Sequence, residues 1–146
     1  MSDVNRNRAH ALTILEPLVG AWIEQLDVAD TPPGHITFEW ALGGQFLLQR
    51  SEIGDPNVPD SLAIIAVAAG GGGYTQHYFD SRGVVRIYAM TFDGQHWTLQ
   101  RTEPDFTPLT FAQRFTGTLS GDGNTIDAMF ETTEVSATWR KDFALS

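Results

Sequence analysis

The feature that most constrains the fold is a series of short strand-like segments, each ended by a turn signal, from residue 21 to residue 145. One segment, residues 36–42 (ITFEWAL), alternates apolar and polar residues, which is typical of a strand with one buried face. Gly43–Gly44 and Asp93–Gly94 are strong turn signals between such segments. About eight to ten strands without long crossovers predict an all-β, antiparallel, up-and-down β-barrel, because closure removes the exposed sheet edges.

The segment before these strands has the spacing of a helix. Ala9, Leu12, Leu15 and Leu18 recur at intervals of three, so we expect a short helix within residues 5–19. Pro17 limits its length, since proline disrupts a helix beyond the first turn. We expect this helix to plug or flank one end of the barrel. No composition shift marks a boundary, and residues 1–146 are therefore predicted to form a single domain.

Composition narrows the class of protein. The net charge is −9, with one lysine and eight scattered arginines, so we expect neither nucleic acid nor anionic membrane as a partner. No apolar run approaches the ~18 residues of a membrane span, and the N-terminus lacks the pattern of a signal peptide. Cysteine is absent, which suits a reducing compartment, and we expect a cytoplasmic protein.

The hairpin around Asp93–Gly94 predicts which side chains face inward. A two-residue turn there pairs Met90 with Trp97 and Tyr88 with Leu99. We place their face inside because it holds more aromatic residues than the other face. Its members are Arg86, Tyr88, Met90, Phe92, Trp97, Leu99 and Arg101.

The preceding strand is placed by the turn DSRG. If this is a four-residue loop, Phe79 pairs with Val84 and His77 with Arg86, and His77 then shares the inward face. A bulge at this turn reverses the assignment, since a one-residue slip moves every side chain to the other face.

On that prediction His77, Arg86, Tyr88 and Arg101 converge on the interior. An inward arginine needs a carboxylate, ordered water or an anionic ligand, because an unpaired buried guanidinium is costly. The alternative is that Arg86 and Arg101 lie near the barrel ends and extend to solvent. The remaining candidates are aromatic or soft apolar residues, which form either a pocket wall or ordinary core: Phe38, Trp40, Met90, Trp97, Phe111 and Phe115.

Two sets of residues carry a resemblance to known families. Gly20–Ala21–Trp22 follows the predicted helix, and Arg140 lies on the last strand. This pairing resembles the calycin superfamily, in which a G-x-W packs under an arginine of the last strand and closes the barrel. Longer stretches, residues 38–53, 74–101 and 111–126, resemble the DUF1579-like family of small uncharacterised bacterial proteins. That resemblance implies a lipocalin-like barrel but no activity. Small residues such as Ala89 and Ala128 suggest a roomier interior than that family's.

Catalytic and metal-binding motifs are not evident. The four histidines show no metal-ligand spacing, so we expect neither a metal site nor another cofactor. There is no G-x-S-x-G nucleophile motif. Acid–base chemistry stays open, with His77 and Tyr88 as candidates, or Glu39 and Glu52 at the barrel mouth.

Three functions follow from these patterns. The first is binding of a small, largely apolar molecule, with or without an acidic group, in the barrel cavity. The second is an isomerase, cyclase or proton-transfer enzyme that uses the same cavity. The third is an interaction module with a filled barrel, which would bind a partner chain or form a homodimer.

Overall fold

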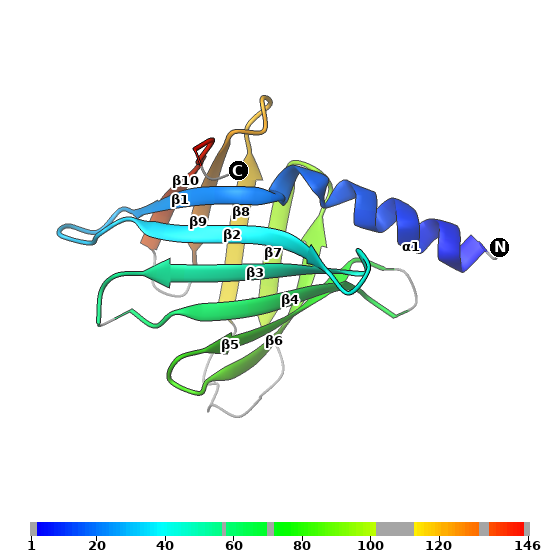
Figure 1. Ribbon diagram of the computed structural model, residues 1–146, viewed down its shortest axis with the longest axis horizontal. Helices are drawn as coiled ribbons and strands as arrows, with labels where there is room; N and C mark the ends of the chain where they lie inside the picture. Colours follow the sequence, from blue (N-terminus) through cyan, green and yellow to red (C-terminus); the bar gives the residue numbers. More distant parts are fainter. Residues whose placement is uncertain (1–2, 57, 70–71, 102–112, 132–134, 145–146) are drawn as a thin grey trace.

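In the part of the chain that the structure describes, ten antiparallel strands form a closed barrel and one α-helix precedes them (Figure 1). The computed structural model describes residues 3–56, 58–69, 72–101, 113–131 and 135–144, and only the backbone of residues 3–6 and 113. Each strand pairs with its neighbours in sequence, and β1 closes the barrel by pairing with β10. The predicted all-β, up-and-down barrel is therefore confirmed.

The strands are short and regularly spaced, as the alternation of their residues requires. Their bounds are β1 Gly20–Leu26, β2 Gly34–Ala41, β3 Phe46–Ile53, β4 Ser61–Val67, β5 Tyr74–Asp80, β6 Val85–Phe92, β7 His96–Arg101, β8 Gln113–Leu119, β9 Thr125–Phe130 and β10 Val135–Lys141. The burial of β2 shows the expected pattern, with Ile36 and Phe38 inside and Thr37 and Glu39 outside.

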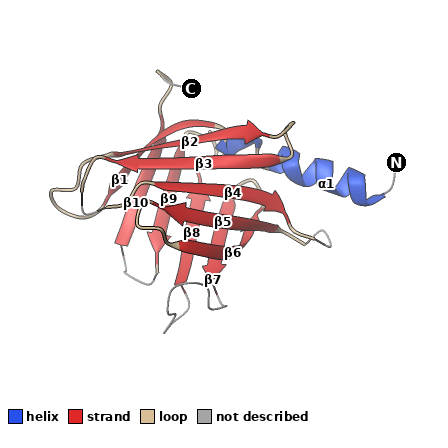
Figure 2. Cartoon of the chain, turned by 60° about the horizontal axis from the view of Figure 1, so that its bottom comes forward, coloured by secondary structure: helices blue, strands red, loops and turns tan. Residues whose placement is uncertain are grey.

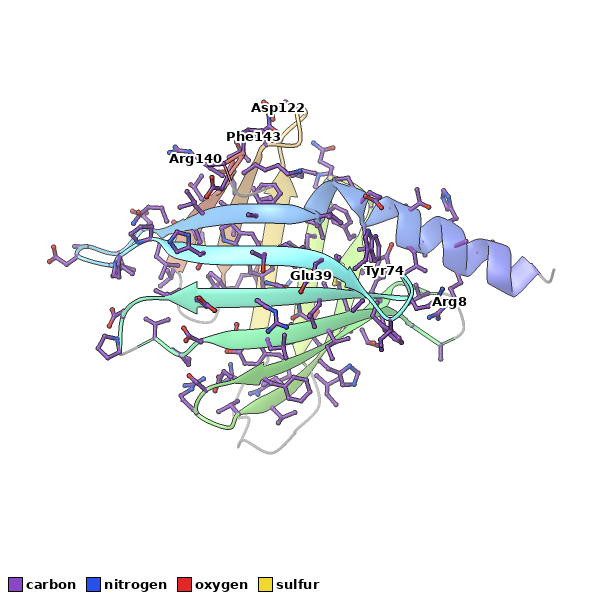
Figure 3. The ribbon with its side chains drawn as sticks, viewed as in Figure 1. Arg8, Glu39, Tyr74, Asp122, Arg140 and Phe143 are labelled. Atoms are coloured by element: carbon purple, nitrogen blue, oxygen red, sulfur yellow. The ribbon has the colours of Figure 1, made fainter. Side chains whose placement is uncertain are left out.

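The N-terminal segment covers one end of the barrel, named here the helix end. Helix α1 spans Asp3–Ile14, and a 3₁₀ turn, η1, follows at Glu16–Leu18. Pro17 lies at the start of η1, which explains why the α-helix ends before the predicted residue 19. The Tyr74 hydroxyl donates a hydrogen bond to the Ala11 carbonyl oxygen at 2.6 Å and ties α1 to β5 (Figure 3). No described helix has the length and apolar character needed to cross a lipid bilayer.

Side chains fill the helix end of the barrel. Leu15 and Leu18 have no exposed surface, and they belong to the same packed cluster as residues from the adjoining strand ends. That cluster includes Trp22, Leu47, Ile65, Met90 and Ile126, all essentially buried. The opposite end, named here the loop end, carries the connections β1–β2, β3–β4 and β5–β6.

The pairing register of both predicted hairpins differs from that in the structure. In the hairpin of β6 and β7 the difference is two residues. Met90 pairs with Leu99 and Phe92 with Trp97, a shift of two residues from the predicted register. The turn centres on Gly94–Gln95, with φ +98° at Gly94, and the Asp93 carboxylate accepts hydrogen bonds from the Gln95 and His96 amides. A shift of two preserves the side-chain faces, so the inward assignment of β6 and β7 is confirmed.

The hairpin between β5 and β6 corrects the other assignment. Asp80 pairs with Val84 across a three-residue loop in which Gly83 has φ +81°. That loop is a turn followed by a left-handed glycine, the bulged form that flips parity. His77 therefore pairs with Ile87, not Arg86, and lies exposed on the outer face. The prediction that His77 faces the interior is wrong.

The cation over Trp22 is a different residue from the one expected. Lys141 pairs with Trp22 across β1 and β10, and its Nζ lies 5.4 Å from the centre of the indole. Arg140, the predicted partner, pairs with Ile23 and is exposed on the outer side of the barrel (Figure 3). Strand alternation explains the correction, since residues 140 and 141 face opposite sides.

This contact leads to a stability prediction. We expect Lys141→Met to lower the free energy of unfolding by about 0.5–1 kcal/mol, the size of a partly exposed cation–π contact. The matched change Arg140→Met is expected to stay within about 0.5 kcal/mol, as for other surface substitutions. Urea denaturation of both variants measures the difference, and equal losses would contradict the assignment of the cation to Lys141.

Candidate functional site

The barrel contains a pocket of about 380 Å³ in the half away from α1. Val58, Pro59 and Arg82 line it, and these residues belong to the loops of the loop end. The arrangement in Figure 2 places these loops at the ends of β3–β6, opposite the end where α1 lies. The volume of the pocket is in the range typical of small-molecule sites. The pocket is therefore suited to a compact ligand that enters from the loop end.

The inner part of the pocket is aromatic. Trp97, Phe115 and Trp139 line it, and their rings pack edge-on or tilted. The centre of Trp97 lies 4.9 Å from that of Phe115 and 5.5 Å from that of Trp139. Phe38 packs behind them, 6.1 Å from Trp97. Such edge-to-face clusters are rigid and apolar, and they give the pocket a fixed hydrophobic floor.

One wall carries a basic group among aromatic residues. Arg86 pairs with Tyr78 across β5 and β6, and its guanidinium carbon lies 5.8 Å from the Tyr78 ring centre. Tyr88, two residues further along β6, meets Tyr78 edge-on at 6.4 Å. The Arg86 Nε is buried and has no hydrogen-bond partner among the residues that the structure describes.

A polar cluster at the rim fixes Tyr78 and Arg82. The Asp80 carboxylate accepts hydrogen bonds from Arg82 Nη2 at 2.7 Å and from the Tyr78 hydroxyl at 2.9 Å. Desolvation raises the pKa of Asp80, but the hydrogen bonds from Arg82 and Tyr78 outweigh it and bring the pKa to about 2. Burial, followed by the hydrogen bond to Asp80, raises the pKa of Tyr78. Both Tyr78 and Arg82 are therefore already paired with Asp80.

The third lining arginine is also paired. Arg114 Nε lies 3.8 Å from Glu131 Oε2, and both side chains are about half exposed. On the inner face, Gln76 Nε2 of β5 donates a hydrogen bond of 3.0 Å across β4 to Gln49 Oε1 of β3. Among the lining arginines, Arg86 is thus the one without a carboxylate partner in the described residues.

A buried carboxyl group lies on the wall formed by β1 and β10. Glu24 is 5% exposed and lines the pocket, and it accepts a hydrogen bond of 2.5 Å from Trp139 Nε1. Burial raises the pKa of Glu24, and the hydrogen bond from Trp139 only partly opposes this. The folded protein therefore holds the proton of this group more tightly than the unfolded chain does.

The difference in the pKa of Glu24 between the folded and the unfolded state predicts how its contribution to stability changes with pH. Because the folded pKa is raised, the folded state binds more protons above pH ~4, and stability falls as the pH rises through that region. Glu24→Gln retains an acceptor for Trp139 and cannot ionise. We expect the variant to resist urea better than the wild type at pH 7. The advantage should shrink towards pH 4, and an advantage that is equal at both pH values would contradict the argument.

The structure places the predicted site residues that it describes on the pocket wall, in the core or on the outer face. Arg86, Tyr88, Trp97 and Phe115 line the pocket. Phe38, Trp40 and Met90 pack in or against the core outside the pocket lining, and Arg101 is buried at the end of β7. His77 lies outside the barrel, as do Glu39 and Glu52, and Phe111 lies outside the described residues. Gly20 begins β1, where it pairs with Phe38.

Sequence reasoning missed several residues of the pocket. A four-residue loop before β6 predicts His77 inside and therefore, by strand alternation, Gln76 and Tyr78 outside, whereas the three-residue loop that ends at Gly83 places both in the pocket lining. Glu24 gave no sequence signal, since an acidic residue on a strand is ordinarily solvated. Trp139 was detectable, because it is one of only four tryptophans and lies in the last strand.

Comparison with known proteins does not assign the chain to a family. No protein-family model matches the chain, and no curated protein matches it. The resemblance to the calycins and to the DUF1579-like family therefore stays a prediction, and the barrel itself is what the structure supports.

Proposed function

We propose that the protein binds a small, largely apolar molecule that carries an acidic group, in the pocket at the loop end of the barrel. The apolar part would rest on Trp97, Phe115 and Trp139, and the acid would be held by Arg86. The closed barrel, with a pocket in one half of its interior, supports a lipocalin-like ligand-binding role of this kind.

The observation that carries the proposal is a pair of unsatisfied donors in the pocket wall. Arg86 Nε and Trp97 Nε1 are buried and lack hydrogen-bond partners among the described residues, and both side chains line the pocket. A buried donor without a partner costs about 1–3 kcal/mol. Both atoms have almost no accessible surface, so a ligand with oxygen acceptors would recover this cost when the two side chains turn towards it, and a carboxylate suits a guanidinium best.

The charge distribution supports the same choice of ligand. The chain carries a net charge of −9, yet three of its eight arginines line the pocket, with Glu24 as the only acidic lining residue among those described. Burial raises the pKa of Glu24, so this carboxyl keeps its proton to a higher pH than an ordinary one does. Because Arg82 and Arg114 are already paired with Asp80 and Glu131, the positive charge that is left on the pocket wall is that of Arg86, which favours an anionic group at that position.

Two measurements test this proposal. Native mass spectrometry after gentle purification would reveal a small molecule that co-purifies with the chain. Isothermal titration then compares decanoate with decanol, which have the same chain length but differ in charge. We expect decanoate to bind at least about tenfold more tightly, the effect of one charge-assisted hydrogen bond. Equal affinities, or no binding of either probe, would refute the proposal.

A second candidate function is a proton-transfer enzyme in the same pocket. The observation in its favour is Glu24, a buried carboxyl with a raised pKa, since such groups serve as acids and bases in enzymes. His77 no longer qualifies, because it faces solvent. Solvent deuterium exchange into a co-purified ligand tests this function. Exchange that requires Glu24 and is lost in Glu24→Gln would support catalysis, and no exchange by the wild type would exclude it for that ligand.

A further inference from the structure

Glu24 and Arg86 lie on opposite sides of the barrel. Arg86 belongs to β6 and Glu24 to β1, and these strands are five steps apart in either direction around the ring of ten. Figure 1 shows β1 and β6 at opposite edges of the barrel. Both residues line the same pocket. A molecule that fills this pocket from wall to wall would therefore meet both side chains.

The Glu24 carboxyl lines the pocket and accepts one hydrogen bond from the described residues. Trp139 Nε1 binds Oε2, and no described cationic side chain forms an ion pair with Glu24. Gly34 pairs with Glu24 across β1 and β2, and a Cβ at that position would lie 3.5 Å from Oε1. That Cβ would also lie 2.8 Å from Cγ1 of Ile53, so the Ile53 side chain occupies the space that the glycine leaves beside Oε1. A ligand group would therefore reach Glu24 from the pocket, which Glu24 and Ile53 both line. A carboxyl oxygen can accept more than one hydrogen bond, and burying it with so few partners is unfavourable.

The wall between these two polar groups is largely apolar on the side of β7–β10 and mixed on the side of β3–β5, where Gln49, Ser51, Ser61 and Gln76 also line the pocket. Ile36, Ile53, Leu99 and Phe115 line the pocket with Glu24 and Arg86. A ligand with a single acidic group would satisfy Arg86 and leave Glu24 facing a hydrocarbon chain. A ligand with a second polar group at its other end would satisfy both.

We propose that Glu24 is a second ligand-binding residue, which accepts a hydrogen bond from a hydroxyl or ammonium group at the end of the ligand remote from its acid. This inference rests on the proposed function, since it takes the acid to lie at Arg86. The ligand class is then an apolar chain or ring with an acid at one end and a hydrogen-bond donor at the other.

The test uses three series of probes with matched chain lengths, from octanoate to tetradecanoate: the plain acids, the ω-hydroxy acids and the ω-amino acids. Chain length is varied because the second group must reach Glu24. We expect one ω-substituted series to bind about three- to tenfold more tightly than the plain acid at its best length, the effect of one additional hydrogen bond. The plain acids should show no such dependence on a second group.

Two variants identify the chemistry of the second group. Glu24→Gln retains hydrogen-bonding capacity but has no negative charge, whereas Glu24→Met has neither. An advantage that survives in Glu24→Gln and disappears in Glu24→Met indicates a hydroxyl. An advantage lost in both variants indicates an ammonium. In each variant the plain acids should bind at least as tightly as they do to the wild type, because the hydrocarbon chain then no longer faces a buried carboxyl group, and this binding shows that the pocket is intact.

The outcomes separate this inference from the proposed function. If plain acids bind through Arg86 but no ω-substituted acid of any length gains affinity, the role of Glu24 is refuted and the acid site stands. If an advantage persists in Glu24→Met, the second group binds elsewhere and the inference also fails. If plain acids do not bind at all, the proposed function itself fails.

Discussion

Decanoate is expected to bind Arg86→Met roughly ten- to a hundredfold more weakly than the wild type. The reason is that Arg86 is the one lining arginine without a carboxylate partner in the described residues, so its charge is available to the ligand. A hydrogen bond to a charged group contributes about 1.5–3 kcal/mol, which corresponds to this range of affinities. Methionine preserves most of the apolar stem, so the loss should come from the guanidinium. Isothermal titration with decanoate and decanol measures the effect.

The matched control is Arg50→Met. Arg50 lies on the outer face of β3, about half exposed, with its Nε 3.7 Å from Glu39 Oε1. This substitution also removes one positive charge from the chain, but from outside the pocket. Decanoate affinity should be unchanged in Arg50→Met, and decanol affinity unchanged in both variants. If the two arginine variants lose decanoate affinity equally, the effect is one of overall charge and the assigned site is wrong.

The second large effect concerns the filled half of the barrel. Leu18→Ala is expected to lower the free energy of unfolding by about 3 kcal/mol, within the range measured for buried leucines. Leu18 has no exposed surface, and its carbonyl oxygen accepts a hydrogen bond of 2.9 Å from Trp22 Nε1. The short turn η1 thus inserts an apolar plug between α1 and the barrel. Urea denaturation followed by tryptophan fluorescence measures the loss.

Leu42→Ala provides the control for this substitution. Leu42 is 78% exposed and lies just after β2, where its φ is +52°. Removing its side chain should change stability by less than about 0.5 kcal/mol, as for surface positions in general. A loss in Leu18→Ala as small as that in Leu42→Ala would mean that the helix end is not a packed plug.

The fold could be predicted from the sequence because the alternation of apolar and polar residues identifies the strands even when the position of a turn is predicted wrongly. Alternation of apolar and polar residues identifies a strand wherever its turn lies, and short connections force neighbouring strands to pair. The hairpin at Gly94 shows this tolerance, since the register was wrong by two residues but Trp97 and Tyr88 still face inward. A closed barrel then follows from the number of strands.

The site was less predictable, because its composition depends on single residues at turns. Gly83 in the left-handed conformation shortens one loop by one residue, which places Tyr78 inside and His77 outside. The cation near Trp22 is Lys141 and not the predicted Arg140, because consecutive residues of a strand face opposite sides and Trp22 pairs with Lys141. Glu24 faces the interior only because β1 as a whole turns its alternate residues inward, and nothing in its own neighbourhood in sequence marks it.

The indole N–H signals of the four tryptophans test the central claim most directly. Trp22 donates to Leu18, Trp40 to Glu16 and Trp139 to Glu24, whereas Trp97 Nε1 has no partner among the described residues. In a ¹H–¹⁵N spectrum assigned with single Trp→Phe variants, saturating decanoate should shift the signal of Trp97 and leave those of Trp22 and Trp40 unchanged. A Trp97 signal that stays in place while decanoate is bound would show that the ligand does not occupy this pocket.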